Sequence, residues 1–161
     1  MNSVAFDIGT GTGVLAAVLA RRGNCLLIYN CNFHVLSHLL LIYMCKLHWN
    51  LNTMSGILRV IGTDIDTRAV SCANDNINRL GLRGRVQVHQ ADLFPPNGAK
   101  AALIVCNPPW IPAKASSPLE RAIFDFNSQM LIGFLRGLKE RLLPGGEGWL
   151  ILSGKLLLIY I

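Results

Sequence analysis

The feature that most constrains the fold is a glycine-rich loop, DIGTGTG at residues 7–13, between a short apolar strand at residues 4–6 and a helix at residues 14–22. Gly9, Gly11 and Gly13 let the backbone turn tightly and approach a ligand closely, because glycine has no side chain to obstruct either. An acidic residue followed by three alternating glycines at a strand–helix junction is specific enough to predict a ligand site there, rather than a turn alone.

The spacing of the glycines narrows the class of ligand. The dinucleotide-binding pattern G-x-G-x-x-G requires a third glycine at position 14, which is Val14, so a nicotinamide oxidoreductase is disfavoured. Asp7, at the end of the strand, suits a ligand that carries a cationic amino-acid group. S-adenosylmethionine is such a ligand, and it has no pyrophosphate for a helix N-terminus to hold. We therefore expect Asp7, Gly9, Gly11 and Gly13 to bind S-adenosylmethionine.

Strands and helices alternate along the rest of the chain. Further strands are predicted at residues 59–62, 85–89, 101–106 and 149–152, and helices at residues 67–80 and 119–142. The run at 101–106 is apolar throughout, as central parallel strands are. This order predicts an α/β fold with a doubly wound, mostly parallel sheet. With 161 residues, the chain is long enough for a single domain, 1–161, and too short for two ordinary ones.

Acidic residues follow the second and third predicted strands. Asp64 comes directly after the second strand, where a carboxylate can accept hydrogen bonds from both ribose hydroxyls. Asp66 is better placed to cap the following helix. Asp92 ends the third strand and could accept the adenine amino group, with Leu93 packing on the ring. A simple turn aspartate remains the alternative for Asp92, since two prolines follow it closely.

The tetrapeptide NPPW at the end of the fourth predicted strand is the most informative one in the chain. Pro108 and Pro109 lack backbone donors and hold the chain extended. The Asn107 side-chain oxygen and the Pro108 carbonyl can then accept both hydrogens of an –NH2 group, which orients the nitrogen lone pair for attack on a methyl group. Trp110 offers a flat face to a planar base or amide. A proline turn with a buried tryptophan is the alternative.

The order DIGTGTG, GTDID, ADLF, NPPW resembles the class I amino-methyltransferases with an Asn-Pro-Pro-aromatic motif, of the methyltransferase small-domain type. The resemblance covers residues 1–23 and 58–153. It implies an S-adenosylmethionine-dependent enzyme that methylates a planar amino or amide nitrogen, either of an RNA or DNA base or of a glutamine in a release factor. The sequence AIFD at 122–125, before a long helix, is also similar to that group. Trp110 is a departure, because tyrosine is commonest there.

The resemblance also implies a seven-stranded sheet, whereas five strands are predicted here. We therefore expect a fold truncated after the fifth strand, with an atypical tail at residues 154–161 and without an N-terminal extension that selects the substrate. A cofactor-binding but inactive fragment, or a regulatory protein, is the alternative function.

Residues 24–57 interrupt the regular pattern. Some 34 residues stand where a connection of about 2–6 is usual, and Lys46 is their one charged side chain. The string LLLIY at 39–43 occurs again at 156–160. We interpret 24–57 as an atypical insertion, and both apolar segments as translated intron; a genuine apolar lid or partner-binding insertion is the alternative.

Charge and cysteine content constrain the partners and the compartment. A net charge of +6 favours an anionic macromolecule, and Lys114 and Arg121 follow Trp110 on the side where it would bind. Nucleic acid, RNA in particular, and protein are both kept as substrates. Five scattered cysteines without a CxxC pair favour a reducing, intracellular location, with the cytoplasm the first expectation. No apolar run reaches the ~18 residues of a membrane helix.

No metal is expected. Cys31, His34, His38 and Cys45 could be assembled into a zinc site, but their spacing matches no familiar ligand pattern.

Overall fold

The structure is a computed structural model that describes residues 3–22, 57–117, 120–152 and 155–160. Six strands, three α-helices and two short 3₁₀ turns form in the described ranges. In chain order they are β1 (Ser3–Ile8), α1 (Val14–Arg22), β2 (Ile57–Asp64), α4 (Thr67–Arg79), β3 (Val86–Gln90), β4 (Ala101–Cys106), η1 (Glu120–Ala122), η2 (Phe126–Ser128), α5 (Gln129–Arg141), β5 (Leu142–Leu152) and β6 (Lys155–Tyr160).

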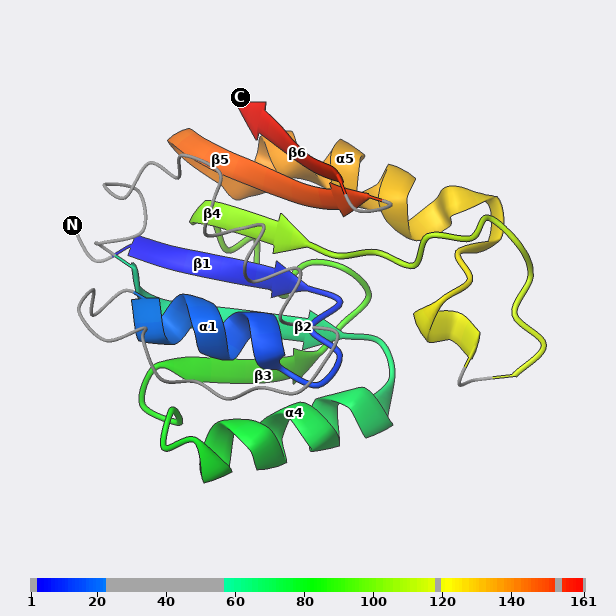
Figure 1. Ribbon diagram of the computed structural model, residues 1–161. Coiled ribbons are helices and arrows are strands. Elements are labelled where there is room, and N and C mark those ends of the chain that lie inside the picture. Colours follow the sequence, from blue (N-terminus) through cyan, green and yellow to red (C-terminus); the bar gives the residue numbers. More distant parts are fainter. Residues whose placement is uncertain (1–2, 23–56, 118–119, 153–154, 161) are drawn as a thin grey trace.

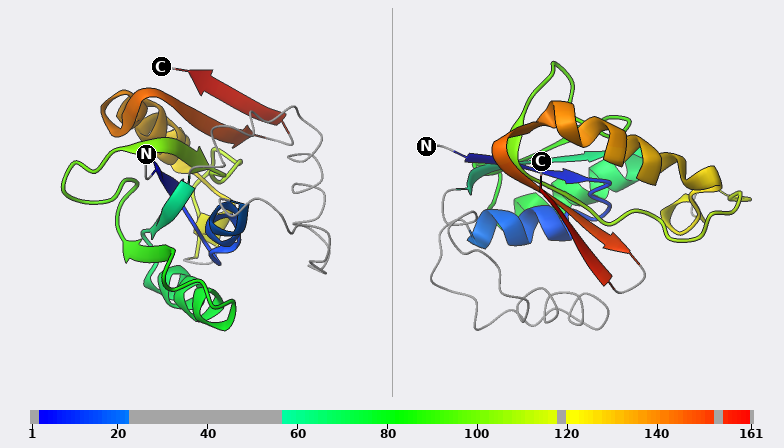
Figure 2. Two further views of the ribbon diagram at one scale, coloured as in Figure 1. Left: turned by 90° about the vertical axis from the view of Figure 1, so that its left-hand side faces the viewer. Right: turned by 90° about the horizontal axis from the view of Figure 1, so that it is seen from above.

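The strands form one sheet in the order β3-β2-β1-β4-β5-β6. The first five are parallel to their neighbours, and β6 runs antiparallel to β5. Helices α1 and α4 lie on one face of the sheet and α5 on the other, as Figures 1 and 2 show. The predicted doubly wound, mostly parallel α/β fold is confirmed.

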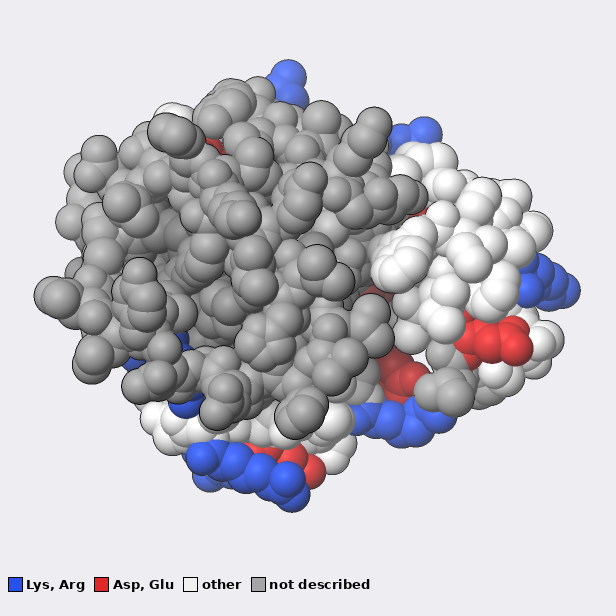
Figure 3. All heavy atoms as spheres, viewed as in Figure 1, with Lys and Arg blue, Asp and Glu red and all other residues white. Residues whose placement is uncertain are grey.

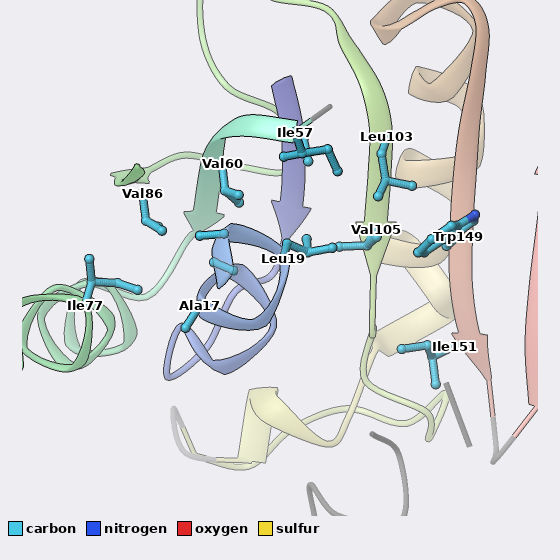
Figure 4. Close-up of a cluster of buried hydrophobic side chains, with 13 residues drawn as sticks. Ala17, Leu19, Ile57, Val60, Ile77, Val86, Leu103, Val105, Trp149 and Ile151 are labelled. Carbon is cyan, nitrogen blue, oxygen red and sulfur yellow. The ribbon is translucent and has the colours of Figure 1, made fainter. Parts of the chain in front are cut away.

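The side chains of the central strands divide between two cores, because successive residues of a strand point to opposite faces. In β1, Ala5 joins the core beneath α1 and α4, whereas Phe6 and Ile8 join the core beneath α5. Figure 4 shows the first of these cores, in which Leu19 of α1 and Ile77 of α4 meet the sheet. A strand buried on both faces must be apolar throughout, which explains the continuous apolar run of β4.

Two predicted elements differ from the observed ones. The helix predicted at 119–142 begins only at Gln129, because Asn127 and Ser128 adopt left-handed φ angles of 55° and 52° that no α-helix accommodates. The five predicted strands are all present, but the described sheet has one strand more. The tail supplies a sixth strand, β6, whose backbone pairs with β5 from Glu147 to Leu152. This strand was not expected, because residues 154–161 were interpreted as an atypical tail although the turn signal Ser153-Gly154 separates two apolar runs.

The predicted insertion lies outside the described residues except for its last residue. Ile57 is buried and begins β2, where it pairs with Ser3. Among the helices that the structure describes, none has the length and the apolar character needed to cross a membrane.

Candidate functional site

The predicted site residues follow strands that end in register at one edge of the sheet. Ile8 of β1 pairs with Thr63 of β2 on one side and with Cys106 of β4 on the other. The residues that follow Ile8, Thr63 and Cys106 in the sequence are Gly9, Asp64 and Asn107. The strand ends therefore bring the glycine loop, the predicted ribose ligand and the NPPW motif together, at the edge toward which the arrows of β1, β2 and β4 point in Figure 1.

The glycine loop has a backbone conformation that favours glycine at three positions. Gly9, Gly11 and Gly13 have φ angles of +69°, +54° and +78°. A Cβ at Gly9 would lie 2.5 Å from the Cε of Met130, and one at Gly13 would lie 3.1 Å from the Cβ of Ala73, so α5 and α4 both press on the loop. A Cβ at Gly11 would meet nothing within 4 Å. The loop is thus packed from two sides and open above Gly11.

Asp7 is buried beneath this loop. The Thr10 hydroxyl donates a hydrogen bond of 2.7 Å to its Oδ2. Burial raises the pKa of Asp7 from 3.8 to about 6, and the negative charge of Asp64 adds to this shift. Hydrogen bonds from Thr10 and from the backbone of Ala16 act in the opposite direction. Asp7 therefore lies at the end of β1 as predicted, but as a buried group that fixes the loop.

Asp64 connects the end of β2 to the glycine loop. Its Oδ2 accepts a hydrogen bond of 3.0 Å from the backbone N–H of Gly11, and its Oδ1 accepts one of 2.9 Å from that of Asp66. Each carboxylate oxygen retains a second lone pair for a ligand. The carboxylate is thus held in one orientation in a partly exposed position.

Asp66 is the N-cap of α4, as the sequence predicts. Its side chain accepts a hydrogen bond from the backbone N–H of Arg68, which satisfies one of the orphan donors of the first turn. The Arg68 guanidinium lies 2.5 Å from the other carboxylate oxygen. Chiefly because of this side-chain hydrogen bond, the pKa of Asp66 is lowered to about 2.

The residues after β3 extend the same edge of the sheet. Ala91 donates its backbone N–H to the Asp64 carbonyl at 3.0 Å, which places Asp92 next in line with an exposed side chain. Leu93 has a φ of 63°, and its carbonyl accepts a hydrogen bond from the Thr63 hydroxyl. The Leu93 side chain packs toward Gly133 of α5. Contact between Leu93 and an adenine ring stays a prediction.

The NPPW motif leaves β4 as an extended segment. Pro108 is buried, Asn107 is exposed, and Trp110 is 61% exposed. The alternative of a buried tryptophan is therefore excluded. The Asn107 amide makes no hydrogen bond to a described residue, so it remains available to a ligand.

A backbone clamp holds the motif on its far side. The N–H groups of Trp110 and Ile111 both donate to the Ile123 carbonyl at 3.1 Å, and the Ile111 carbonyl accepts a hydrogen bond of 2.8 Å from Asp125. Ile111 and Phe124 thereby form an isolated parallel bridge. The clamp fixes the backbone that carries the exposed indole.

Asp125 is a buried site residue to which the sequence assigned no role. Its carboxylate accepts hydrogen bonds from the backbone N–H groups of Met130 and Leu131, at 3.0 and 3.1 Å. The sequence AIFD at residues 122–125 indicated only a resemblance to the amino-methyltransferases. The signal that could have identified the residue is an aspartate four residues before a helical apolar pattern, where it can cap the first turn.

Charged groups are sparse on the segment that follows Trp110. In Figure 3 the segment projects on the right as a largely uncharged surface with isolated basic and acidic groups. Lys114 and Arg121 are exposed there, beyond the NPPW motif as expected. The Arg85 side chain donates to the backbone carbonyls of Ile57 and Leu58, at the amino end of β2 and therefore away from the carboxyl ends of the strands.

A metal centre finds no support in the described ranges. No cluster of three or more His, Cys, Asp or Glu side chains there could hold an ion. The cysteines and histidines considered for zinc lie outside those ranges.

The site suits a ligand with hydroxyl and amino groups. Accessible carboxylates, Asp64 and Asp92, lie at the ends of β2 and β3, whereas the Asp7 carboxylate is buried. The open space above Gly11 lets a ligand such as S-adenosylmethionine approach the backbone closely.

Comparisons with known proteins identify the family and the fold. The family model described as the RMKL-like methyltransferase domain matches residues 9–154. The chain is 38% identical to a release factor glutamine methyltransferase of Moorella thermoacetica over 103 residues, which are 62% of this chain and 36% of that protein. It is 44% identical over 54 residues to the ribosomal RNA large subunit methyltransferase K/L of Methylococcus capsulatus, 32% of this chain and 7% of that one. The chain thus spans about a third or less of these relatives.

Solved structures share the fold at low sequence identity. A methyltransferase from Pyrococcus furiosus has a TM-score of 0.54 at 19% identity, over 96% of this chain and 57% of that one. The ribosomal protein L11 methylase of Lactobacillus delbrueckii subsp. bulgaricus has a TM-score of 0.53 at 17% identity, over 93% and 51%.

Proposed function

The chain belongs to the RMKL-like methyltransferase domain family, and we propose that it transfers a methyl group from S-adenosylmethionine to a planar amino or amide nitrogen. The observation that carries this proposal is the register of the sheet. Because Ile8 pairs with both Thr63 and Cys106, the cofactor loop at Gly9 and the acceptor motif at Asn107 begin side by side. A methyl transfer requires donor and acceptor to meet in this way.

The proposed cofactor contacts follow from the described carboxylates. Asp64 would bind the ribose hydroxyls, and Asp92 the adenine amino group. The backbone of the loop at Gly9, Gly11 and Gly13 would lie against the methionine part, with Asp7 holding the loop beneath it through Thr10. When bound, the cofactor supplies an electrophilic methyl group on a positively charged sulfur.

The acceptor nitrogen would be held by the NPPW motif. The exposed Asn107 oxygen and the Pro108 carbonyl accept the two hydrogens of an –NH2 group, and their partial negative charges stabilise the positive charge that grows on nitrogen. Trp110, with more than half of its surface exposed, stacks on the plane that carries this nitrogen. Its backbone N–H is tied to Ile123, so the ring projects from a fixed base. Pro109 keeps the segment extended between the two contacts.

Methyl transfer to a neutral amino nitrogen requires no strong general acid or base. Once methylated, the nitrogen is strongly acidic and loses its extra proton to water. The chain's own contribution is to place the two reactants and to stabilise charge, which are the terms that position and preorganised dipoles supply.

An amino group on an RNA base and a glutamine amide present the same planar –NH2 group, so this geometry takes both. The basic side chains of Lys114 and Arg121 beyond Trp110, and the net charge of +6, favour RNA. The two relatives are named as a release factor glutamine methyltransferase and a ribosomal RNA methyltransferase. An intracellular location is part of the same proposal.

The test is labelled-methyl transfer with the full chain, offered bulk RNA in one reaction and protein extract in another. Product in either reaction that depends on the cofactor supports the proposal, and the reaction that gives product identifies the acceptor class. Calorimetric binding of S-adenosylmethionine without product in either reaction would point instead to a regulatory or inactive fragment. Absence of binding would contradict the cofactor assignment.

A further inference from the structure

Asp125 is hydrogen-bonded both to the acceptor segment and to the first turn of α5, the helix that packs on the cofactor loop. We propose that Asp125 is a positioning residue that sets the acceptor segment, residues 107–111, against the cofactor loop, residues 9–13. The inference rests on the proposed function, because it concerns how the acceptor motif is held for transfer.

The first connection runs from the Asp125 side chain to α5. Both carboxylate oxygens are used, Oδ1 by the N–H of Met130 and Oδ2 by the N–H of Leu131. Ser128 occupies the N-cap position of α5 but makes no side-chain capping bond. Asp125 therefore satisfies orphan donors of the first turn from outside the helix, and its negative charge faces the positive end of the helix dipole.

The second connection runs from the Asp125 backbone to the acceptor segment. Its N–H donates to the Ile111 carbonyl at 2.8 Å, and its carbonyl accepts a hydrogen bond of 2.9 Å from Ser128. Two residues earlier, the Ile123 carbonyl receives the N–H groups of Trp110 and Ile111. A shift of Asp125 would consequently move the backbone that carries Trp110.

The third connection runs from α5 to the cofactor loops. The Cε of Met130 fills the space in which a Cβ of Gly9 would stand, and the Leu93 side chain fills the space beside Gly133. Met130 donates its backbone N–H to one Asp125 carboxylate oxygen. The same residue packs on the cofactor loop. α5 is the rigid link between the loop after β1 and the buried carboxylate that holds the acceptor segment.

This arrangement separates a positioning role from a purely structural one. A carboxylate that only capped α5 would affect the free energy of unfolding and nothing else. A carboxylate that registers the two loops would affect the rate of methyl transfer more than cofactor affinity, because a displacement of about 1 Å in reacting groups can cost ~10²-fold in rate. It would also change the surroundings of the Trp110 ring.

The experiment compares the full-length wild-type chain with Asp125→Ala and Asp125→Asn, with Asp75→Ala as a control that removes an exposed carboxylate of α4. Three quantities are measured: the single-turnover transfer rate at saturating S-adenosylmethionine, the calorimetric Kd of the cofactor, and acrylamide quenching of Trp110. The Trp110 signal is obtained by subtracting each protein's Trp110→Phe counterpart.

We expect Asp125→Ala to lose about 10²-fold in rate while its cofactor Kd changes by less than about 3-fold. Its Trp110 quenching constant should differ from that of the wild type. Asp125→Asn, which keeps one accepting oxygen, should fall between the two, and Asp75→Ala should match the wild type in all three quantities. A folded Asp125→Ala with the wild-type rate and quenching would overturn the proposal.

Two outcomes need separate treatment. If Asp125→Ala shows no cooperative thermal transition, Asp125→Asn decides on the same quantities. If the wild type binds no cofactor and methylates nothing, the proposed function fails, and the quenching of Trp110 alone decides whether Asp125 positions the acceptor segment. Unchanged quenching would then refute that role as well.

Discussion

Gly11 donates its backbone N–H to the carboxylate of Asp64 at 3.0 Å, across 53 residues of sequence. This bond joins the loop after β1 to the end of β2, so the same carboxylate shapes the glycine loop and faces the open space above it. Asp64 and the loop therefore form one unit, and changes to either should affect cofactor binding.

Asp64→Ala should weaken S-adenosylmethionine binding substantially. Hydrogen bonds to a charged group contribute about 1.5–3 kcal/mol each, and the Gly11 anchor is lost as well. Asp66→Ala is the matched control, because it removes a neighbouring carboxylate that caps α4. That variant should be less stable than the wild type, because it loses the cap of α4, and should keep the wild-type cofactor Kd. Calorimetry with equal affinity for Asp64→Ala and the wild type would remove Asp64 from the site.

Asp7→Asn should change how stability depends on pH. The pKa of Asp7 is about 6 in the folded chain against 3.8 for the free group, so the folded state binds the proton more tightly. Stability from this group is present below pH 3.8 and is lost as pH rises to 6, by roughly 3 kcal/mol in all. The asparagine variant lacks this loss. Its melting temperature relative to the wild type should therefore rise between pH 4 and pH 7, and parallel curves would contradict the account.

Alanine substitutions at Gly9 and Gly11 should differ in their cost. Both positions have left-handed φ, which costs a non-glycine residue about 1–2 kcal/mol. Only at Gly9 would the new Cβ also meet Met130, at 2.5 Å, which adds an overpacking cost of about 1–3 kcal/mol. Gly9→Ala should thus be the less stable in urea unfolding, and Gly9→Ala combined with Met130→Ala should recover part of the difference. Equal stability of the single variants would show that α5 does not press on the loop.

Removing residues 24–56 should leave a cooperative fold. α1 ends at Arg22 and β2 begins at Ile57, so the deletion leaves Gly23 as the connection, and the last turn of α1 is expected to open to supply the about 2–6 residues usual between a helix and the next strand. Ile57 is kept because it is buried and paired with Ser3. A thermal transition close to that of the full chain is expected. A variant without a transition would mean that the segment is required structure.

Local patterns of apolar and capping residues predicted most of the fold, because they determine where the strands of the sheet and its helices lie along the chain. β4 was predicted to the residue, since a strand buried on both faces is apolar throughout, and Asp66 was identified as a cap because it stands directly before a helical pattern. The start of α5 was not, because the left-handed Asn127 and Ser128 have no apolar signature. β6 was missed because its residues were interpreted as translated intron, although it follows β5 after only two residues.

The site was predicted in part for the same reason. Residues that follow strands, such as Asp64 and Asn107, could be placed because parallel strands end at one edge. The burial of Asp7 and the role of Asp125 could not, since both depend on which helix packs over which loop. The assignments of individual residues to cofactor and acceptor remain predictions.

The most direct test of the account is single-turnover transfer of a labelled methyl group by Asn107→Ala. Asn107 is proposed to hold the acceptor nitrogen, whose positive charge grows only as the methyl group moves. Removing the Asn107 amide should therefore lower the transfer rate rather than weaken cofactor binding. By analogy with oxyanion-hole donors, we expect a rate lower by about 10²–10³-fold, with an unchanged Kd for S-adenosylmethionine. Trp110→Tyr should be mild, because both rings stack. Full activity in Asn107→Ala would contradict the assignment of amino-nitrogen methylation to this site.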